Sequence, residues 1–166
     1  MPQTDLPVRA VTSQTMRHAL AGFPTGIAVV AAEVDGQVVG ISANSFTSVS
    51  LDPPLVSISF ARTSTSWPVL RRAPQWGISV LGEDAHGVLT SLRRPAHERF
   101  TDLQIEVSPS GAAFLAGSLA TLRVEVDTEV DAGDHVLTLL RVLDLARDDE
   151  QLPLVFFGSG AHRLAR

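Results

Sequence analysis

The segment Gly40–Pro54, GISANSFTSVSLDPP, gathers the side chains most able to bind a ligand. Serine, threonine and asparagine alternate there with apolar residues before an Asp-Pro-Pro break. Gly and Asn are depleted in strands, and apolar packing does not account for so many polar side chains. One interpretation is a strand that ends in a hydroxyl-rich loop satisfying its own backbone. The other is a binding segment for a polar, multiply anionic ligand that also has a flat apolar part.

His135 has the clearest chemical context of the histidines, because it follows Gly133 and Asp134 at a turn. From the residues alone, it is interpreted as a turn histidine beside Asp134 that closes a hairpin. The remaining histidines do not form a metal-ligand spacing such as HExxH, and the chain has no cysteine. The stretch Gly40–Asn44 lacks the last glycine of the GxSxG elbow of hydrolases. We therefore expect neither a metal site nor a serine hydrolase.

Composition narrows the chemistry further. The chain has 166 residues and no cysteine, lysine or tyrosine, so all 13 of its basic residues are arginine. A cysteine nucleophile, a Schiff base and a phenolic proton donor are excluded, and any cationic anchor for a phosphate must be arginine. The net charge of −5 argues against a nucleic-acid partner, which needs a basic surface.

Neither a leader peptide nor a membrane segment is expected. The first ten residues are polar and lack an apolar core, and no apolar run approaches the roughly 20 residues of a membrane-spanning helix. Together with the absence of cysteine, these features predict a soluble protein located in the cytoplasm, with no membrane partner.

The hydrophobic pattern predicts several short strands and few helices. Asp35-Gly36 is typical of a two-residue hairpin turn. The strands are expected at Ile27–Val34, Val38–Ala43, Leu55–Phe60, Gln75–Leu81, Leu119–Val126, His135–Leu145 and, as the final one, Leu154–Phe157. Helices are expected from Thr12 or Ser13 to Leu20, over Trp67–Arg72 and over Asp84–Leu92, with an irregular segment Arg93–Ser110.

These elements predict a mainly β fold, an antiparallel closed barrel with a few peripheral short helices. No βαβ rhythm, GxGxxG or GxxxxGK[ST] pattern supports a Rossmann or P-loop fold. We expect one domain over residues 1–166, with residues 1–11 as a loose N-terminal arm. Trp67 and Trp76 are expected in the core or in a subunit contact.

The order of several motifs resembles a known family. They are Pro24–Ile27, Asn44–Pro54, Gly77–Leu81, Arg99-Phe100, Gly133–His135 and Pro153–Phe157. The chain is thereby similar to the flavin reductase-like family, the small reductase components of two-component flavin-dependent monooxygenases. It departs from the family pattern at Ser79, where many relatives have asparagine, and near the C-terminus, which lacks tyrosine.

The resemblance implies an antiparallel split β-barrel, usually a homodimer, that binds FMN or FAD and uses NADH or NADPH as hydride donor. By that similarity His135 contacts the nicotinamide or the flavin and positions it, rather than acting as an acid or base. The residues expected to contact the flavin are Thr25, Gly26, Ala43, Asn44, Ser45, Phe46, Thr47, Ser48, Ser50, Arg62, Ser64, Arg94 and Phe100. Arg93, Arg94 and Arg99 either bind the adenine-dinucleotide part of FAD or NAD(P)H or are solvated.

The function that the resemblance implies is an NAD(P)H-dependent flavin reductase that supplies reduced flavin to a separate monooxygenase. One alternative is a flavoprotein of the same fold with tightly bound FMN, acting as an electron carrier or an oxidoreductase. The other is a split-barrel module that binds no flavin.

Overall fold

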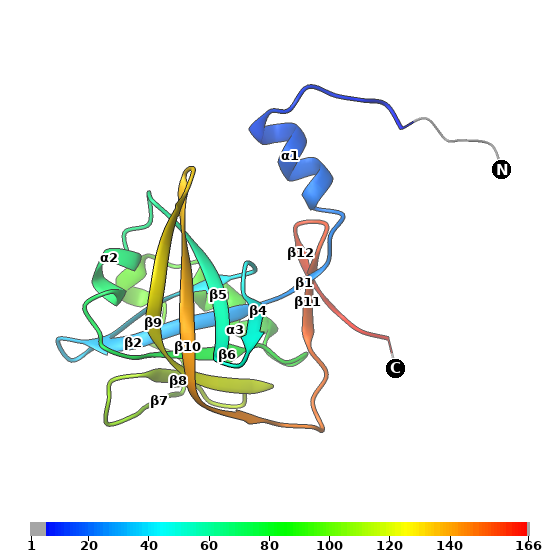
Figure 1. The fold of residues 1–166 in the computed structure, drawn as a ribbon. Helices are drawn as coiled ribbons and strands as arrows, with labels where there is room; N and C mark the ends of the chain where they lie inside the picture. Colours follow the sequence, from blue (N-terminus) through cyan, green and yellow to red (C-terminus); the bar gives the residue numbers. More distant parts are fainter. Residues whose placement is uncertain (1–5, 166) are drawn as a thin grey trace.

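The structure is a computed structural model that describes residues 6–165. Strands dominate, and the helices are short (Figure 1). In chain order the elements are α1 (Ser13–Leu20), β1 (Thr25–Gly26), β2 (Ala28–Val34), β3 (Gln37–Ala43), β4 (Thr47–Leu51), β5 (Pro54–Ala61), α2 (Trp67–Leu70), β6 (Trp76–Val80), α3 (His86–Leu92), the 3-10 helix η1 (Ala96–Glu98), β7 (Ile105–Val107), β8 (Ala113–Leu115), β9 (Ala120–Ala132), β10 (His135–Arg147), β11 (Leu154–Phe157) and β12 (Gly160–Arg163).

The main sheet has seven strands in the order β3-β2-β6-β9-β10-β5-β4, and all neighbours are antiparallel. The predicted antiparallel β-barrel is confirmed, but as the split barrel rather than the closed one. In the described chain β3 and β4 are the two edges of the sheet and do not pair with each other. Three residues, Asn44–Phe46, connect β3 to β4, so this segment runs from one edge of the sheet to the other.

The strand β2 is buried on both faces, as its alanine and valine content predicts. Ala28 and Val30 face a core inside the barrel, where Phe60 and Trp76 are also buried. Val29 faces a second core, which continues under α3 and the C-terminal hairpin β11–β12. Trp76 Nε1 donates to the Leu70 carbonyl at 2.9 Å, so the polar atom of this side chain is satisfied.

Three local expectations differ from the structure. The hydroxyl-rich loop, one of the two interpretations of Gly40–Pro54, is limited to Asn44–Phe46, because from Thr47 the backbone pairs with β5 across a bulge at Val49 and forms strand β4. The segment expected to be irregular contains η1 and β7, and β7 pairs with β8 to form a small separate sheet. The final strand is β12 rather than β11, since Ser159, with positive φ, turns the chain back.

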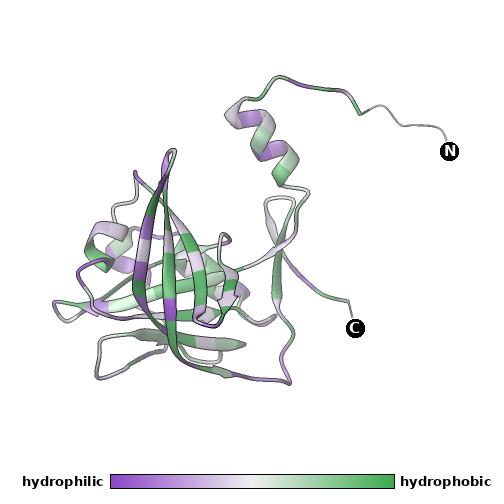
Figure 2. Cartoon of the chain, in the orientation of Figure 1, coloured by the Kyte–Doolittle hydropathy of each residue, from purple (hydrophilic) through white to green (hydrophobic). Residues whose placement is uncertain are grey.

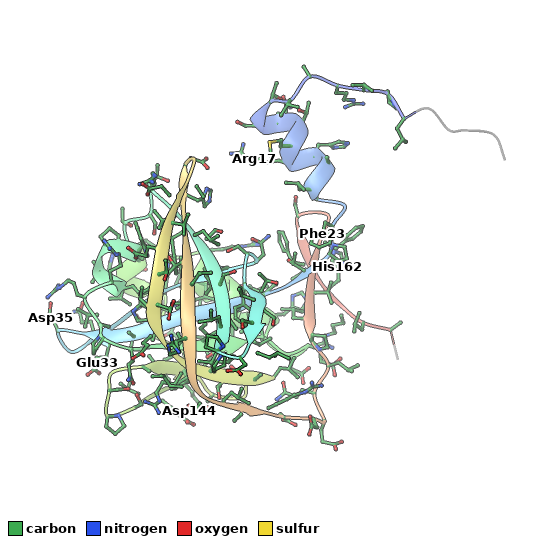
Figure 3. The ribbon with its side chains drawn as sticks, in the orientation of Figure 1. Arg17, Phe23, Glu33, Asp35, Asp144 and His162 are labelled. Atoms are coloured by element: carbon green, nitrogen blue, oxygen red, sulfur yellow. The ribbon has the colours of Figure 1, made fainter. Side chains whose placement is uncertain are left out.

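The helix α1 stands apart from the barrel (Figure 1). Thr12 and Thr15 form its capping box, and none of its residues is buried. Figure 2 shows apolar and polar residues alternating around it. The Gly158 amide donates to the Ala21 carbonyl at 2.9 Å, and Figure 3 shows Phe23 and His162 where α1 meets the C-terminal hairpin.

The predicted N-terminal arm lies partly outside the described residues. From Leu6 to Val11 the chain is exposed and belongs to no helix or strand. Among the described residues, no helix combines the length and the apolar character needed to cross a bilayer.

Candidate functional site

The segment Asn44–Phe46 is fixed by one serine. Ser45 Oγ accepts a hydrogen bond from the Ser59 amide at 3.1 Å and lies 3.3 Å from the Ser59 carbonyl, to which it donates. The edge of β5 that β4 leaves unpaired is thereby occupied by a side chain. This contact holds the segment against the barrel, so its remaining polar groups face outward.

Three hollows surround Asn44, which lines all of them. The His135 cavity has a volume of about 360 Å³ and is lined by Ile41, Ser42, Ala43, Asn44, Ser45, Ser59, Ala61, Ser64, Leu92, Arg99 and His135. The Phe23 cavity has a volume of about 550 Å³ and is lined by Leu20, Ala21, Phe23, Pro24, Thr25, Gly26, Asn44, Ser45, Phe46, Thr47 and Phe156. The Arg93 cavity has a volume of about 260 Å³ and is lined by Ile27, Ser42, Ala43, Asn44, Leu89, Arg93, Phe156 and Ala161.

His135 is carried to its cavity by the long β9–β10 hairpin. Gly133, at φ +63°, makes the turn, and His135 begins β10 directly opposite Ala61 of β5. Its Nδ1 lies 2.7 Å from Asp134 Oδ1, and this hydrogen bond holds the pKa of the Asp134 carboxyl below its ordinary value. An ionised Asp134 accepts a hydrogen bond from Nδ1–H of His135. The other ring nitrogen, Nε2, is then the one that can contact a ligand.

Arg99 is the cation of the His135 cavity. Arg94, Arg99, Arg123 and Arg141 are the half-buried arginines in the described part of the chain, and three of them pair with aspartates. Arg99 pairs with no carboxylate there and is held only by neutral acceptors, the Arg94 carbonyl, the Gly40 carbonyl and Ser66 Oγ. Its charge is therefore available to an anionic ligand.

Thr25 supplies a different signal. Its Oγ1 is buried and has no hydrogen-bond partner within residues 6–165, although Thr25 lines the Phe23 cavity. A buried hydroxyl without a hydrogen-bond partner destabilises the folded protein, so we expect a ligand or an ordered water to bond to it. Gly26, beside it, has nothing within 4 Å of the place where a Cβ would stand.

Most of the residues predicted from the sequence come together here. Ala43, Asn44, Ser45, Ser64 and His135 line the His135 cavity, and Thr25, Gly26, Phe46 and Thr47 line the Phe23 cavity.

Five of the predicted residues lie elsewhere. Ser48 and Ser50 are on the edge strand β4 and line none of the cavities described here. Arg62 is bound to Asp131 and to the Gly133 carbonyl, and Arg94 to Asp102. Phe100 is buried in the second core and lines a further hollow.

Two polar residues of the His135 cavity, Ser42 and Ser59, were not predicted, and Arg99 was predicted only as one of two alternatives. Ser42 and Ser59 alternate with core residues on their strands, which signals an outward face but no cavity. Arg99 was a candidate for a dinucleotide, and only the structure separates it from its paired neighbours. Ser79, where the family pattern differs, accepts the Leu115 amide at 3.0 Å and has a structural role.

Comparisons with known proteins agree with this geometry. The family model described as "Flavin reductase like domain" matches residues 19–165. The FMN reductase (NADH) SmoA of Agrobacterium fabrum is 37% identical over 93% of this chain and 87% of its own length. The reductase subunit HsaB of a flavin-dependent monooxygenase from Rhodococcus jostii is 31% identical over 89% of this chain and 76% of its own.

A solved structure supports the same assignment. The NADH:FAD oxidoreductase SgcE6 of Streptomyces globisporus superposes with a TM-score of 0.87 at 29% identity, covering 97% of this chain and all of its own. The family model spans nearly the whole chain. The chain therefore belongs to the flavin reductase like domain family.

Proposed function

We propose that the protein is an NAD(P)H-dependent flavin reductase that reduces FMN or FAD and supplies the reduced flavin to a partner monooxygenase. The observation that carries the proposal is the unpaired Arg99 guanidinium in a cavity walled by Asn44–Ser45 and His135. Relatives named as reductases of FMN and FAD and as a monooxygenase subunit support it.

The residues of the cavities fit a flavin mononucleotide. The Asn44–Phe46 backbone offers amide donors to the polar edge of a flat ring, and Ser42 and Ser59 offer hydroxyls to a ribityl chain. Arg99 and Ser64 suit the phosphate, and the buried Thr25 hydroxyl is a further unpartnered group beside the segment. A bound flavin supplies the two-electron acceptor, and NADH or NADPH supplies the hydride.

The protein contributes position rather than proton transfer. Hydride transfer needs two rings held about 3–3.5 Å apart with water excluded, and it needs no protein base. His135 is oriented by Asp134 and lines the cavity in which the nicotinamide ring has to approach the flavin. We assign it the positioning of that ring through Nε2.

The deciding measurement is anaerobic oxidation of NADH, with and without FMN, repeated with FAD and with NADPH. Turnover that depends on added flavin is expected. Flavin that stays bound through desalting, with no turnover of added flavin, would instead indicate a protein with tightly held FMN.

Replacing His135 by leucine is expected to lower kcat/KM for NADH about 3- to 10-fold, the value of one neutral hydrogen bond. The Kd for FMN should stay within twofold, since Arg99 and the Asn44–Phe46 segment are untouched. His135→Gln should recover part of the rate, because its amide can still donate or accept. An equal loss in both variants, with weaker FMN binding, would indicate a structural role only. Stopped-flow reduction at saturating FMN measures the effect.

Replacing Thr25 by valine is expected to raise the free energy of unfolding by about 1 kcal/mol, because it removes a buried hydroxyl that has no partner. The same change should weaken FMN binding about 3- to 10-fold if the hydroxyl contacts the flavin. Thr25→Ser, which keeps the hydroxyl, is the control. Unchanged FMN affinity in Thr25→Val, measured by fluorescence quenching, would remove Thr25 from the site.

A homodimer is also proposed, on the basis of α1. Met16 and Leu20 are 50% and 61% exposed on a helix with no buried residue, and Phe23 beyond it is 69% exposed. An amphipathic helix without a partner face suits a second copy of the chain. Leu20→Glu is expected to shift the sedimentation of the protein from dimer toward monomer, with Arg9→Glu, on the exposed arm, as control. A wild-type monomer at micromolar concentration would contradict the proposal.

We further propose that residues 1–166 act as one domain and that the protein works in the cytoplasm. The absence of cysteine and the supply of nicotinamide cofactors in that compartment support the location. Fractionation of the cells that produce the protein tests it.

A further inference from the structure

A second large hollow lies next to the His135 cavity along β3. The Phe100 cavity has a volume of about 540 Å³ and includes residues 37–39 of β3 in its wall. Residues 41–43 of the same strand line the His135 cavity, and Gly40 lies between the two. At roughly 3.3 Å per residue, Ala43 and Val38 are about 17 Å apart along the strand.

Two other segments also pass from the His135 cavity to the Phe100 cavity. Ser64 lines the His135 cavity, whereas the next two residues, Thr65 and Ser66, line the Phe100 cavity. Arg99 lines the first and Phe100 the second. Three separate segments thus pass from one hollow to the other between consecutive or nearly consecutive residues, so the two hollows are adjacent, and we call the pair a trough.

Arg99 divides this trough. Its Nε donates to the Arg94 carbonyl at 3.2 Å, and its Nη1 donates to the Gly40 carbonyl at 3.2 Å and to Ser66 Oγ at 3.0 Å. These bonds leave both protons of Nη2 without a protein acceptor, and no carboxylate among the described residues neutralises the charge. Ser66 is 3% exposed and accepts from Arg99, so its own hydroxyl proton is free to be donated.

The order along the trough is a polar cavity, an unpaired guanidinium and a mainly apolar cavity. Val39, Val69, Phe100 and Leu103 line the last of these. Such an order matches a molecule made of a flavin ring, a pyrophosphate and an adenosine, because a guanidinium suits phosphate oxygens and an apolar wall suits a flat base.

We propose that the Phe100 cavity binds the adenosine of FAD and that FAD, rather than FMN, is the preferred flavin. This inference rests on the proposed function, and it narrows the flavin substrate to one class. The pyrophosphate lies over Arg99 Nη2, and the Ser66 hydroxyl is the donor at the entrance to the adenosine end.

The test fills the Phe100 cavity from its exposed rim. Thr101→Trp places a large side chain there, and Thr90→Trp, on the exposed face of α3 and outside both cavities, is the matched control. Thr65→Trp fills the same cavity from the opposite wall and serves where Thr101→Trp does not fold. The Kd values of FAD, FMN and riboflavin are measured by fluorescence quenching, with melting temperature as a check on folding.

The expected result is that the wild-type protein binds FAD at least tenfold more tightly than FMN. Filling the cavity should abolish that preference, with FMN affinity unchanged within twofold. Equal wild-type affinity for FAD and FMN, or an FAD affinity that survives both tryptophan variants, would overturn the inference. A tryptophan variant in which only the KM for NADH rises, with FMN as acceptor, would also overturn the inference. It would assign the cavity to the adenosine of the nicotinamide cofactor. Continued FMN-dependent NADH oxidation in these outcomes would leave the reductase proposal intact.

Discussion

Replacing Gly77 by alanine is expected to remove about 3 kcal/mol from the free energy of unfolding, a large share of the 5–15 kcal/mol typical of a domain. Gly77 lies in β6, between β2 and β9. A Cβ there would overlap the Ala113 carbonyl oxygen and stand 2.7 Å from the Ala113 carbonyl carbon and 2.9 Å from Phe114 Cδ1. The obstacle is mainly backbone, which cannot rotate away as a side chain can.

A shift of β6 cannot relieve this overlap, because β6 is paired on both sides and β8 covers its face. Urea unfolding followed by tryptophan fluorescence measures the loss, and the buried Trp76 is adjacent to the change. Gly26→Ala is the matched control, since its Cβ would meet nothing within 4 Å and its φ is not positive. A Gly77→Ala midpoint equal to that of the control would show that β8 moves aside at little cost.

Replacing Arg99 by glutamine is expected to raise the Kd for FMN about 10- to 100-fold. Hydrogen bonds to charged groups contribute about 1.5–3 kcal/mol, and 1.4 kcal/mol corresponds to a factor of ten. Riboflavin has no phosphate, so its Kd should change less than threefold. The difference between the two ligands isolates the phosphate contact from any general damage to the cavity.

Arg94→Gln is the control for Arg99→Gln. Arg94 is also half-buried and nearby, but its guanidinium is paired with Asp102 and lines none of the cavities near Asn44. We expect FMN affinity within threefold of wild type in this variant. A loss of FMN affinity in Arg94→Gln that matches Arg99→Gln would place the phosphate outside the His135 cavity, as would an equal loss of riboflavin affinity.

Local sequence signals predicted the fold well where the backbone itself sets the structure. Asp35 and Gly36 adopt the positive φ values, 52° and 76°, that a tight hairpin requires, so the β2–β3 turn could be predicted from two residues. Strand β4 could not, because its serine-rich composition favours a loop and only the long-range pairing with β5 overrides that preference.

The candidate site also contains residues that local motifs predict and residues that only long-range contacts place. The Asn44–Phe46 segment and His135 were found because a continuous motif and a turn mark them. Arg62 was predicted as a flavin contact and Arg99 only as a candidate for the adenine-dinucleotide part, because the distinction depends on which arginine meets a carboxylate. Asp131 is 69 residues from Arg62 along the chain, and no local pattern connects them.

The two-sided burial of β2 has a consequence for how the protein unfolds. Its alternate residues belong to two cores, one inside the barrel and one under α3 and the C-terminal hairpin, so neither core can open without exposing the strand that completes the other. A change that destabilises one core therefore destabilises the other, and the barrel and its outer layer should melt in a single transition.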